Sequence, residues 1–98
     1  MSVIFELIDK TGRKIRLTKK QHSHIMKKHS TMANYFEEIK ETLSNPNAIT
    51  LSKIDKDVRF YYKYYKRLKS PYNYILVIVK YLNGNGFVVS AYFEKNIK

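Results

Sequence analysis

The sequence predicts a single α+β domain over residues 1–98, in which a short N-terminal hairpin and two helices precede a four-stranded antiparallel sheet. Apolar residues recur at helical spacing in two neighbouring segments, within about residues 19–29 and 32–43. Segments on both sides of this pair are short, rich in aromatic and β-branched residues, and separated by turn residues, as strands are. A chain of 98 residues forms one modest core.

A hairpin and a capped helix are predicted first. Val3–Ile8 is expected to be a strand that returns as Lys14–Leu17 after a turn. Thr18 is a suitable N-cap, and Gln21 stands three residues later, which together predict a helix over Lys19–His29.

The second helix is predicted to begin at Met32 or Asn34 and to end at Leu43, before the turn residues 44–47. Its apolar side chains fall within about 100° of each other, as expected of a helix face that packs on a sheet. These side chains are Met32, Tyr35, Phe36, Ile39 and Leu43.

The remaining residues are predicted to form an antiparallel meander against which the helices pack. Tyr72–Leu82 is apolar at nearly every position, which is typical of a central strand covered on both faces. The segment Asn83–Gly86 is a strong hairpin signal. The four strands expected are Ala48–Lys53, Val58–Lys66, Tyr72–Leu82 and Phe87–Glu94.

Charge is the most unusual property of the composition. Nineteen Lys and Arg residues stand against eight Asp and Glu residues, which gives a net charge of +11. Such an excess favours a polyanionic partner, and RNA is the partner expected here. A generally lysine-rich composition without functional meaning is the alternative.

Several classes of protein are excluded or disfavoured. The chain has no cysteine, so disulfides, iron–sulfur clusters and zinc–thiolate sites are excluded. Its first residues lack a basic segment followed by a long apolar one, and its longest apolar run is far shorter than the ~20 residues of a membrane span. A cytoplasmic protein without membrane association is therefore expected.

The strand Val58–Lys66 alternates in a way that suits RNA binding. One face carries Val58, Phe60, Tyr62 and Tyr64, while the other interleaves cations with rings. Cations neutralise phosphates and rings stack on unpaired bases. A charged edge strand with tyrosine chosen for its β propensity is the alternative. The residues assigned to RNA binding are Arg59, Tyr61, Lys63, Tyr65 and Lys66.

The histidines do not form a metal site by spacing. His22 and His24 point to different sides of a helix, and His22 and His29 are two turns apart, roughly 10 Å. No metal and no cofactor are therefore expected. RNA can be cleaved without metal, because its 2′-OH attacks the adjacent phosphate when a base, an acid and cations are supplied. A surface or half-buried packing role is the alternative for each histidine.

Lys80 interrupts an apolar strand, and a lysine at such a position needs a partner or a task. A regular two-residue loop at Gly84-Asn85 would put Lys80 and Ser90 on opposite faces of the sheet. The apolar patterns of the two strands match only if a three-residue loop or a bulge shifts the register. We therefore expect Lys80, Ser90 and Tyr92 on one face, opposite the buried Val77, Val79, Val89 and Ala91, with Lys80 opposite Ser90. Arg59, Tyr61 and Lys63 are expected on the same face, with His24 or His29 at its margin.

Short motifs across residues 17–93 resemble the barnase–EndoU–colicin–RelE (BECR) superfamily of small nuclease and toxin domains, in particular its phage and mobile-element branch. The run 24–30, His-Ile followed by Lys-His-Ser, is similar to the family's "HI..RHP" helix, with Ser30 in place of proline. Residues 86–92, GFVVSAY, are similar to "GFVVTAY", with Ser90 in place of threonine.

The resemblance implies a RelE/barnase-like arrangement and a metal-independent endoribonuclease, with many relatives acting as toxins. Its polar positions fall on His24, His29, Lys80, Ser90 and Tyr92. We expect His29 or His24 to act as general acid or base, Lys80 to stabilise the phosphorane, and Ser90 and Tyr92 to bind phosphate or transfer protons. An acidic antitoxin or immunity protein is the expected protein partner. A non-catalytic RNA-binding module and an adaptor that docks an acidic protein are the alternatives.

Overall fold

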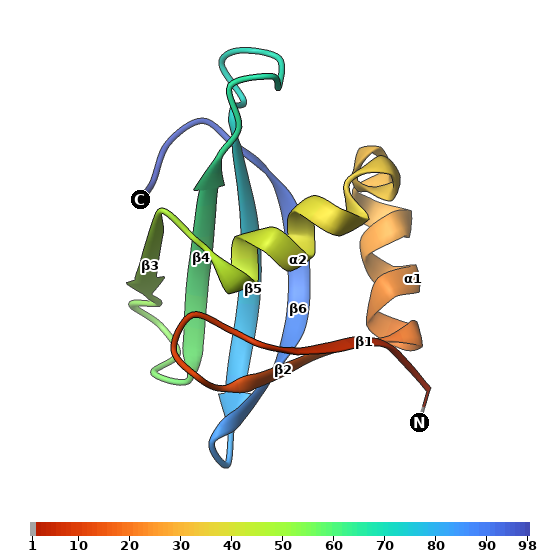
Figure 1. Ribbon diagram of the computed structural model, residues 1–98, viewed down its shortest axis with the longest axis vertical. Helices are drawn as coiled ribbons and strands as arrows, with labels where there is room; N and C mark the ends of the chain where they lie inside the picture. Colours follow the sequence, from red (N-terminus) through yellow and green to blue (C-terminus); the bar gives the residue numbers. More distant parts are fainter. Residues whose placement is uncertain (1) are drawn as a thin grey trace.

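A computed structural model of the protein describes residues 2–98 and confirms the α+β class (Figure 1). Residue 1 of the predicted domain lies outside the described residues. Two α-helices and a 3₁₀ helix cover one face of a six-stranded sheet with the strand order β1-β2-β6-β5-β4-β3. The elements are β1 (Val3–Ile8), β2 (Lys14–Thr18), α1 (Lys19–Lys28), η1 (Ser30–Asn34), α2 (Phe36–Ser44), β3 (Ala48–Leu51), β4 (Val58–Tyr64), β5 (Tyr74–Leu82) and β6 (Asn85–Glu94).

The prediction of a four-stranded, wholly antiparallel sheet is wrong. The β1–β2 hairpin joins the sheet because Ile15 and Arg16 of β2 pair in parallel with Gly86 and Phe87 of β6. Parallel pairing between segments so distant in the chain has no local turn signal, so the pattern of single residues could not reveal it.

The predicted helix cap forms as expected. The Thr18 hydroxyl accepts a hydrogen bond from the Gln21 N–H at 3.2 Å. The helix ends at Lys28, and His29 is its C-cap residue. A short 3₁₀ helix follows, so α2 begins only at Phe36, later than the prediction of Met32 or Asn34.

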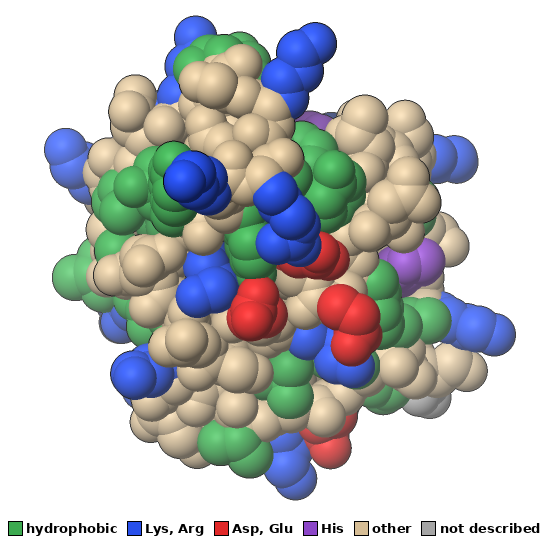
Figure 2. Space-filling model, turned by 45° about the horizontal axis from the view of Figure 1, so that its top comes forward, with side chains coloured by type: hydrophobic (Ala, Val, Ile, Leu, Met, Phe, Trp, Pro, Cys, Tyr) green, Lys and Arg blue, Asp and Glu red, His purple; other side chains and the backbone are tan. Residues whose placement is uncertain are grey.

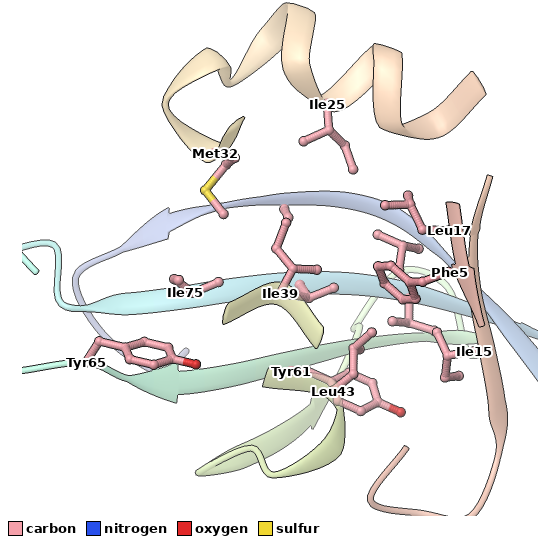
Figure 3. Packing of buried hydrophobic residues seen from close by; sticks show 14 of the residues in the cluster. Phe5, Ile15, Leu17, Ile25, Met32, Ile39, Leu43, Tyr61, Tyr65 and Ile75 are labelled. Carbon is pink, nitrogen blue, oxygen red and sulfur yellow. The ribbon is translucent and has the colours of Figure 1, made fainter. Parts of the chain in front are cut away.

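The core lies between the helices and the inner face of β4, β5 and β6 (Figure 3). Ile25 of α1, Met32 of η1, and Ile39 and Leu43 of α2 are buried against this face. The sheet contributes buried residues at alternating positions, as a half-covered sheet must. These residues are Tyr61, Ile75, Val77, Val79, Val88 and Ala91.

The two faces of β4 alternate as predicted, but the face assigned to RNA points into the molecule. Arg59, Tyr61 and Lys63 pair with Val79, Val77 and Ile75, whose side chains belong to the core face. They therefore do not share a face with Lys80, which corrects that expectation. Burial decided the orientation, because tyrosine rings fill a core as well as they cover a surface.

A β-bulge at Val89 sets the register between β5 and β6. The loop has two residues, Asn83 and Gly84, both with positive φ (54° and 84°), as a type I′ turn requires. Near this loop Val79 pairs with Val88, but beyond it Ile78 pairs with Ser90, so Val89 is the extra residue.

The expectation of a three-residue loop or a bulge is confirmed by the bulge, but the residue expected opposite Lys80 and one of the residues expected to be buried are wrong. Ser90 and Tyr92 lie opposite Ile78 and Leu76, on the same face as Lys80. Lys80 itself pairs with Phe87, not with Ser90. Val88 replaces Val89 among the buried residues, because the bulge turns the Val89 side chain out of the core.

Candidate active site

Helix α1 lies along the edge of β6 that β2 leaves unpaired (Figure 1). The side-chain amide of Gln21 donates a hydrogen bond to the Val89 carbonyl at 3.1 Å. The bulge thus provides a backbone carbonyl to which the start of the helix is fastened. Bulges often occur beside active sites because they redirect neighbouring side chains.

His29 and Tyr92 form a stacked pair where α1 ends. Their ring centroids are 5.0 Å apart and the ring planes meet at 24°. His29 is at the C-cap of α1, while Tyr92 extends from β6. Two of the predicted site residues, separated widely in the sequence, are therefore in contact.

The Tyr92 hydroxyl is favoured in its neutral form. Burial raises the pKa of Tyr92, and the nearby carboxylate of Glu94 raises it further. A tyrosine with such a pKa is a hydrogen-bond donor throughout the neutral pH range.

His24 lies on the stripe of α1 that begins with Gln21. It stands three residues after Gln21 and four residues before Lys28, so the three side chains form one stripe. At ~1.5 Å per helical residue and ~3.3 Å per strand residue, His24 lies at the level of Ser90. His24 is exposed, and Ser90 is partly exposed.

Lys80 shares the outer face with Ser90, but its ammonium is engaged elsewhere. It forms an ion pair of 2.9 Å with Asp55, in the loop between β3 and β4. The backbone N–H of Asp57 and the ammonium of Lys80 donate hydrogen bonds to Asp55 and lower its pKa, and the carboxylate in turn raises the pKa of Lys80. Lys80 lies four residues along β5 from the position opposite Tyr92, which is about 13 Å.

The predicted RNA-binding residues do not form one surface. Tyr61 is 0% exposed and Tyr65 is 6% exposed, so neither ring is available to stack on a base, which corrects their assignment (Figure 3). Arg59 donates to the carbonyl of Lys56, and Lys63 donates to the carbonyl of Asn45. Lys66 alone among the five is exposed, while Arg59 and Lys63 are partly buried.

A hollow of about 690 Å³ opens beside the stacked pair. Its walls come from the end of α1, from η1, from the loop between β4 and β5, and from the end of β6. Five of its ten lining residues carry aromatic rings. The lining residues are His29, Thr31, Tyr35, Leu68, Lys69, Ser70, Pro71, Tyr72, Tyr92 and Phe93.

The comparison with protein families connects this chain with nucleic-acid chemistry. The sequence model of the family described as "phage-Barnase-EndoU-ColicinE5/D-RelE like nuclease2" matches residues 4–98. The chain belongs to this family of BECR nucleases. The resemblance found in the short motifs is thereby confirmed, and nucleic acid is the substrate that membership implies. Neither the comparison with curated proteins nor that with solved structures found a match.

Several residues of this BECR nuclease that shape the site were not predicted. Gln21 was taken only as part of a helix cap, yet its side chain docks α1 on β6. Lys28 could have been found from its spacing to His24 on one helix stripe. Tyr35, Tyr72 and Phe93 gave no signal, because only the tertiary fold brings them to one hollow.

Among residues 2–98, no three side chains of His, Cys, Asp or Glu gather in a way that could hold a metal ion. Within the same range, no helix has the length and apolar character needed to cross a membrane.

Proposed function

We propose that this BECR nuclease is a metal-independent endoribonuclease whose reaction takes place beside His29 and Tyr92. The contact between these two rings carries the proposal, because it joins an imidazole, the commonest general acid or base, with a neutral hydroxyl donor. His24 of α1 and Ser90 of β6 are the further groups that we expect the same RNA strand to meet.

The chemistry needs only groups that this chain supplies. A neutral histidine removes the proton of the ribose 2′-OH, and the 2′-oxygen attacks the adjacent phosphorus. The bond from phosphorus to the 5′-oxygen then breaks, and that oxygen takes a proton from an acid, either the second histidine or the phenol of Tyr92. The products are a 2′,3′-cyclic phosphate and a free 5′-OH.

The charge that develops on the phosphorane must be balanced by donors and cations. Lys28 stands on the stripe of α1 that carries His24, and Ser90 and Tyr92 contribute hydroxyl groups. Lys80 is a candidate for a phosphate further along the strand, because Asp55 holds its ammonium away from Tyr92.

A toxin role, with an acidic antitoxin or immunity protein as partner, is part of the proposal. A net charge of +11 favours association with polyanions and with strongly acidic proteins. We expect induced expression to arrest growth of the host cell, and the His29→Ala variant, expressed at the same level, to relieve that arrest. Equal arrest by both chains would contradict a toxin role that depends on cleavage.

The proposed chemistry is tested with purified protein and mixed RNA in excess EDTA. We expect fragments with 2′,3′-cyclic phosphate and 5′-OH ends, since no step uses a metal. Loss of cleavage in EDTA, with recovery on added Mg²⁺ or Zn²⁺, would contradict this mechanism. Binding of RNA without any cleavage would instead support a non-catalytic RNA-binding module.

A further inference from the structure

The hollow beside His29 and Tyr92 has walls that suit the flat faces of a nucleobase. Tyr35 and Phe93 meet edge to face, with ring centroids 5.1 Å apart and planes at 90°. The stacked rings of His29 and Tyr92 form another wall, and Tyr72 stands on the loop between β4 and β5. Its volume of about 690 Å³ lies within the ~300–1,000 Å³ typical of sites for small organic groups.

Two lysines stand at the rim of this hollow. Lys69 is one of its lining residues, and the ammonium of Lys95 lies 5.3 Å from the centroid of the Tyr72 ring. None of the described residues that line it is acidic. A base attached to an anionic backbone therefore meets rings inside the hollow and cations at its rim.

The second hollow of the described residues offers a contrast. Three of its six lining residues are glutamates of α2, namely Glu37, Glu38 and Glu41. Figure 2 shows acidic side chains gathered near the middle of one face, with Lys and Arg spread around them. A phosphate backbone is repelled there, so the hollow beside Tyr92 suits a nucleic acid better than this acidic one.

We propose that the hollow beside Tyr92 binds an unpaired nucleobase, adjacent to the phosphate that His29 and Tyr92 act on. This inference rests on the proposed function and adds its substrate class, single-stranded or looped RNA. A base inside a duplex is stacked and paired, so its faces cannot enter the hollow. Stacking uses the flat face that every base has, so this contact tolerates different bases.

The test measures binding separately from cleavage. RNA oligonucleotides with 2′-O-methyl riboses cannot form the cyclic phosphate, so their affinity is measured by fluorescence anisotropy without turnover. One is single-stranded and the other is a duplex of the same length. Tyr72→Ala is compared with Tyr64→Ala, because the two tyrosines are 46% and 48% exposed and Tyr64 is outside the hollow.

We expect Tyr72→Ala to weaken single-strand binding about 10-fold, Tyr72→Phe to restore it, and Tyr64→Ala to change it little. The affinity for the duplex should be lower than that for the single strand, and Tyr72→Ala should leave the affinity for the duplex unchanged. Equal effects of Tyr72→Ala and Tyr64→Ala, or equal affinity of the wild-type protein for the two RNAs, would overturn the proposal.

Failure of the base site and failure of the proposed function give different results. If the wild-type protein cleaves RNA but Tyr72 has no influence on binding, the base site is wrong and the endoribonuclease stands. If binding depends on Tyr72 but the wild-type protein cleaves no RNA, the base site stands and the endoribonuclease is wrong.

Discussion

At the scale of single residues, the bulge at Val89 decides the chemistry of the outer face. The turn at Asn83 and Gly84 alone would pair Ser90 with Val77 and turn the serine into the core. The extra residue moves Ser90 opposite Ile78, so that its hydroxyl and the Tyr92 ring come to the outer face. The bulge also presents the carbonyl to which Gln21 binds.

The hydroxyl of Tyr92 can be tested apart from its ring. Tyr92→Phe keeps the stacking on His29 and removes only the donor. We expect kcat to fall about 10²-fold, with little change in KM or in the free energy of unfolding. Steady-state kinetics on one defined RNA measure this, and an unchanged kcat would show that the hydroxyl takes no part.

The raised pKa of Tyr92 predicts a feature of the pH profile. Burial and Glu94 favour the neutral phenol, so its proton remains bound above the ordinary value of about 10. Ionisation of Tyr92 should therefore cause no decline of wild-type activity between about pH 8 and 10. The pH profiles of the wild-type protein and of Tyr92→Phe should have the same shape in this range. A fall in activity in this range that the wild-type protein shows and Tyr92→Phe does not would contradict the assignment.

At the scale of elements, a buried polar network fastens the β1–β2 hairpin to the sheet. Asp9, in the hairpin turn, is 5% exposed and accepts hydrogen bonds from Thr11, from the Arg13 N–H and from the Tyr61 hydroxyl. The Tyr61 and Tyr81 hydroxyl oxygens are 2.5 Å apart. Tyr61 therefore acts as a structural residue of the inner face rather than as an RNA-binding ring.

Tyr61→Phe is expected to destabilise the protein by about 1–3 kcal/mol, because it removes a donor from a buried carboxylate. Urea denaturation measures this loss. Tyr64→Phe is the matched control, since the exposed Tyr64 lies on the same strand and should change stability by less than about 0.5 kcal/mol. Equal stabilities of the two variants would contradict the role of the network.

At the scale of the whole molecule, the buried tyrosines predict a loss of stability at alkaline pH. Burial is the main cause that raises the pKa of Tyr61, Tyr65 and Tyr92 in the folded protein. Above about pH 10 the unfolded chain releases phenolic protons that the folded chain retains, so the free energy of unfolding decreases. The stabilisation is complete below that pH and is lost as the pH rises through the folded pKa values.

Denaturation in urea at several pH values between about 8 and 11 measures this dependence. Tyr61→Phe has one such tyrosine fewer, so its stability should fall less steeply above about pH 10 than that of the wild-type protein. Parallel curves for the two proteins would contradict the contribution of Tyr61.

The sequence predicted local features of the fold better than distant ones. The Thr18 cap, the strand Val3–Ile8 and the alternation of β4 follow from neighbouring residues. The parallel β2–β6 pair and the inward direction of Tyr61 depend on packing between distant segments, which residue patterns do not encode locally.

Some features of the candidate site were likewise predicted from the sequence, and others were not. The placement of His24 or His29 near Tyr92 was expected from the motifs that resemble the family, while the stacking of the His29 and Tyr92 rings was not. The shared face of Lys80 and Ser90 followed from the apolar pattern of two strands. The ion pair of Lys80 with Asp55 and the hollow beside Tyr92 could not be predicted, because a loop between strands contributes to each.

An active site at His29 and Tyr92 is most directly tested by comparing His29, the C-cap residue of α1, with His22 inside the same helix. His29 stacks on Tyr92, whereas His22, two turns earlier in the chain, contacts Phe36 with ring centroids 6.1 Å apart. Cleavage of a defined RNA in excess EDTA is measured for His29→Ala and His22→Ala, after urea denaturation has shown that both fold. We expect His29→Ala to lose at least about 10²-fold in rate and His22→Ala to retain nearly full activity. Equal rates for the two folded variants would contradict an active site at His29 and Tyr92.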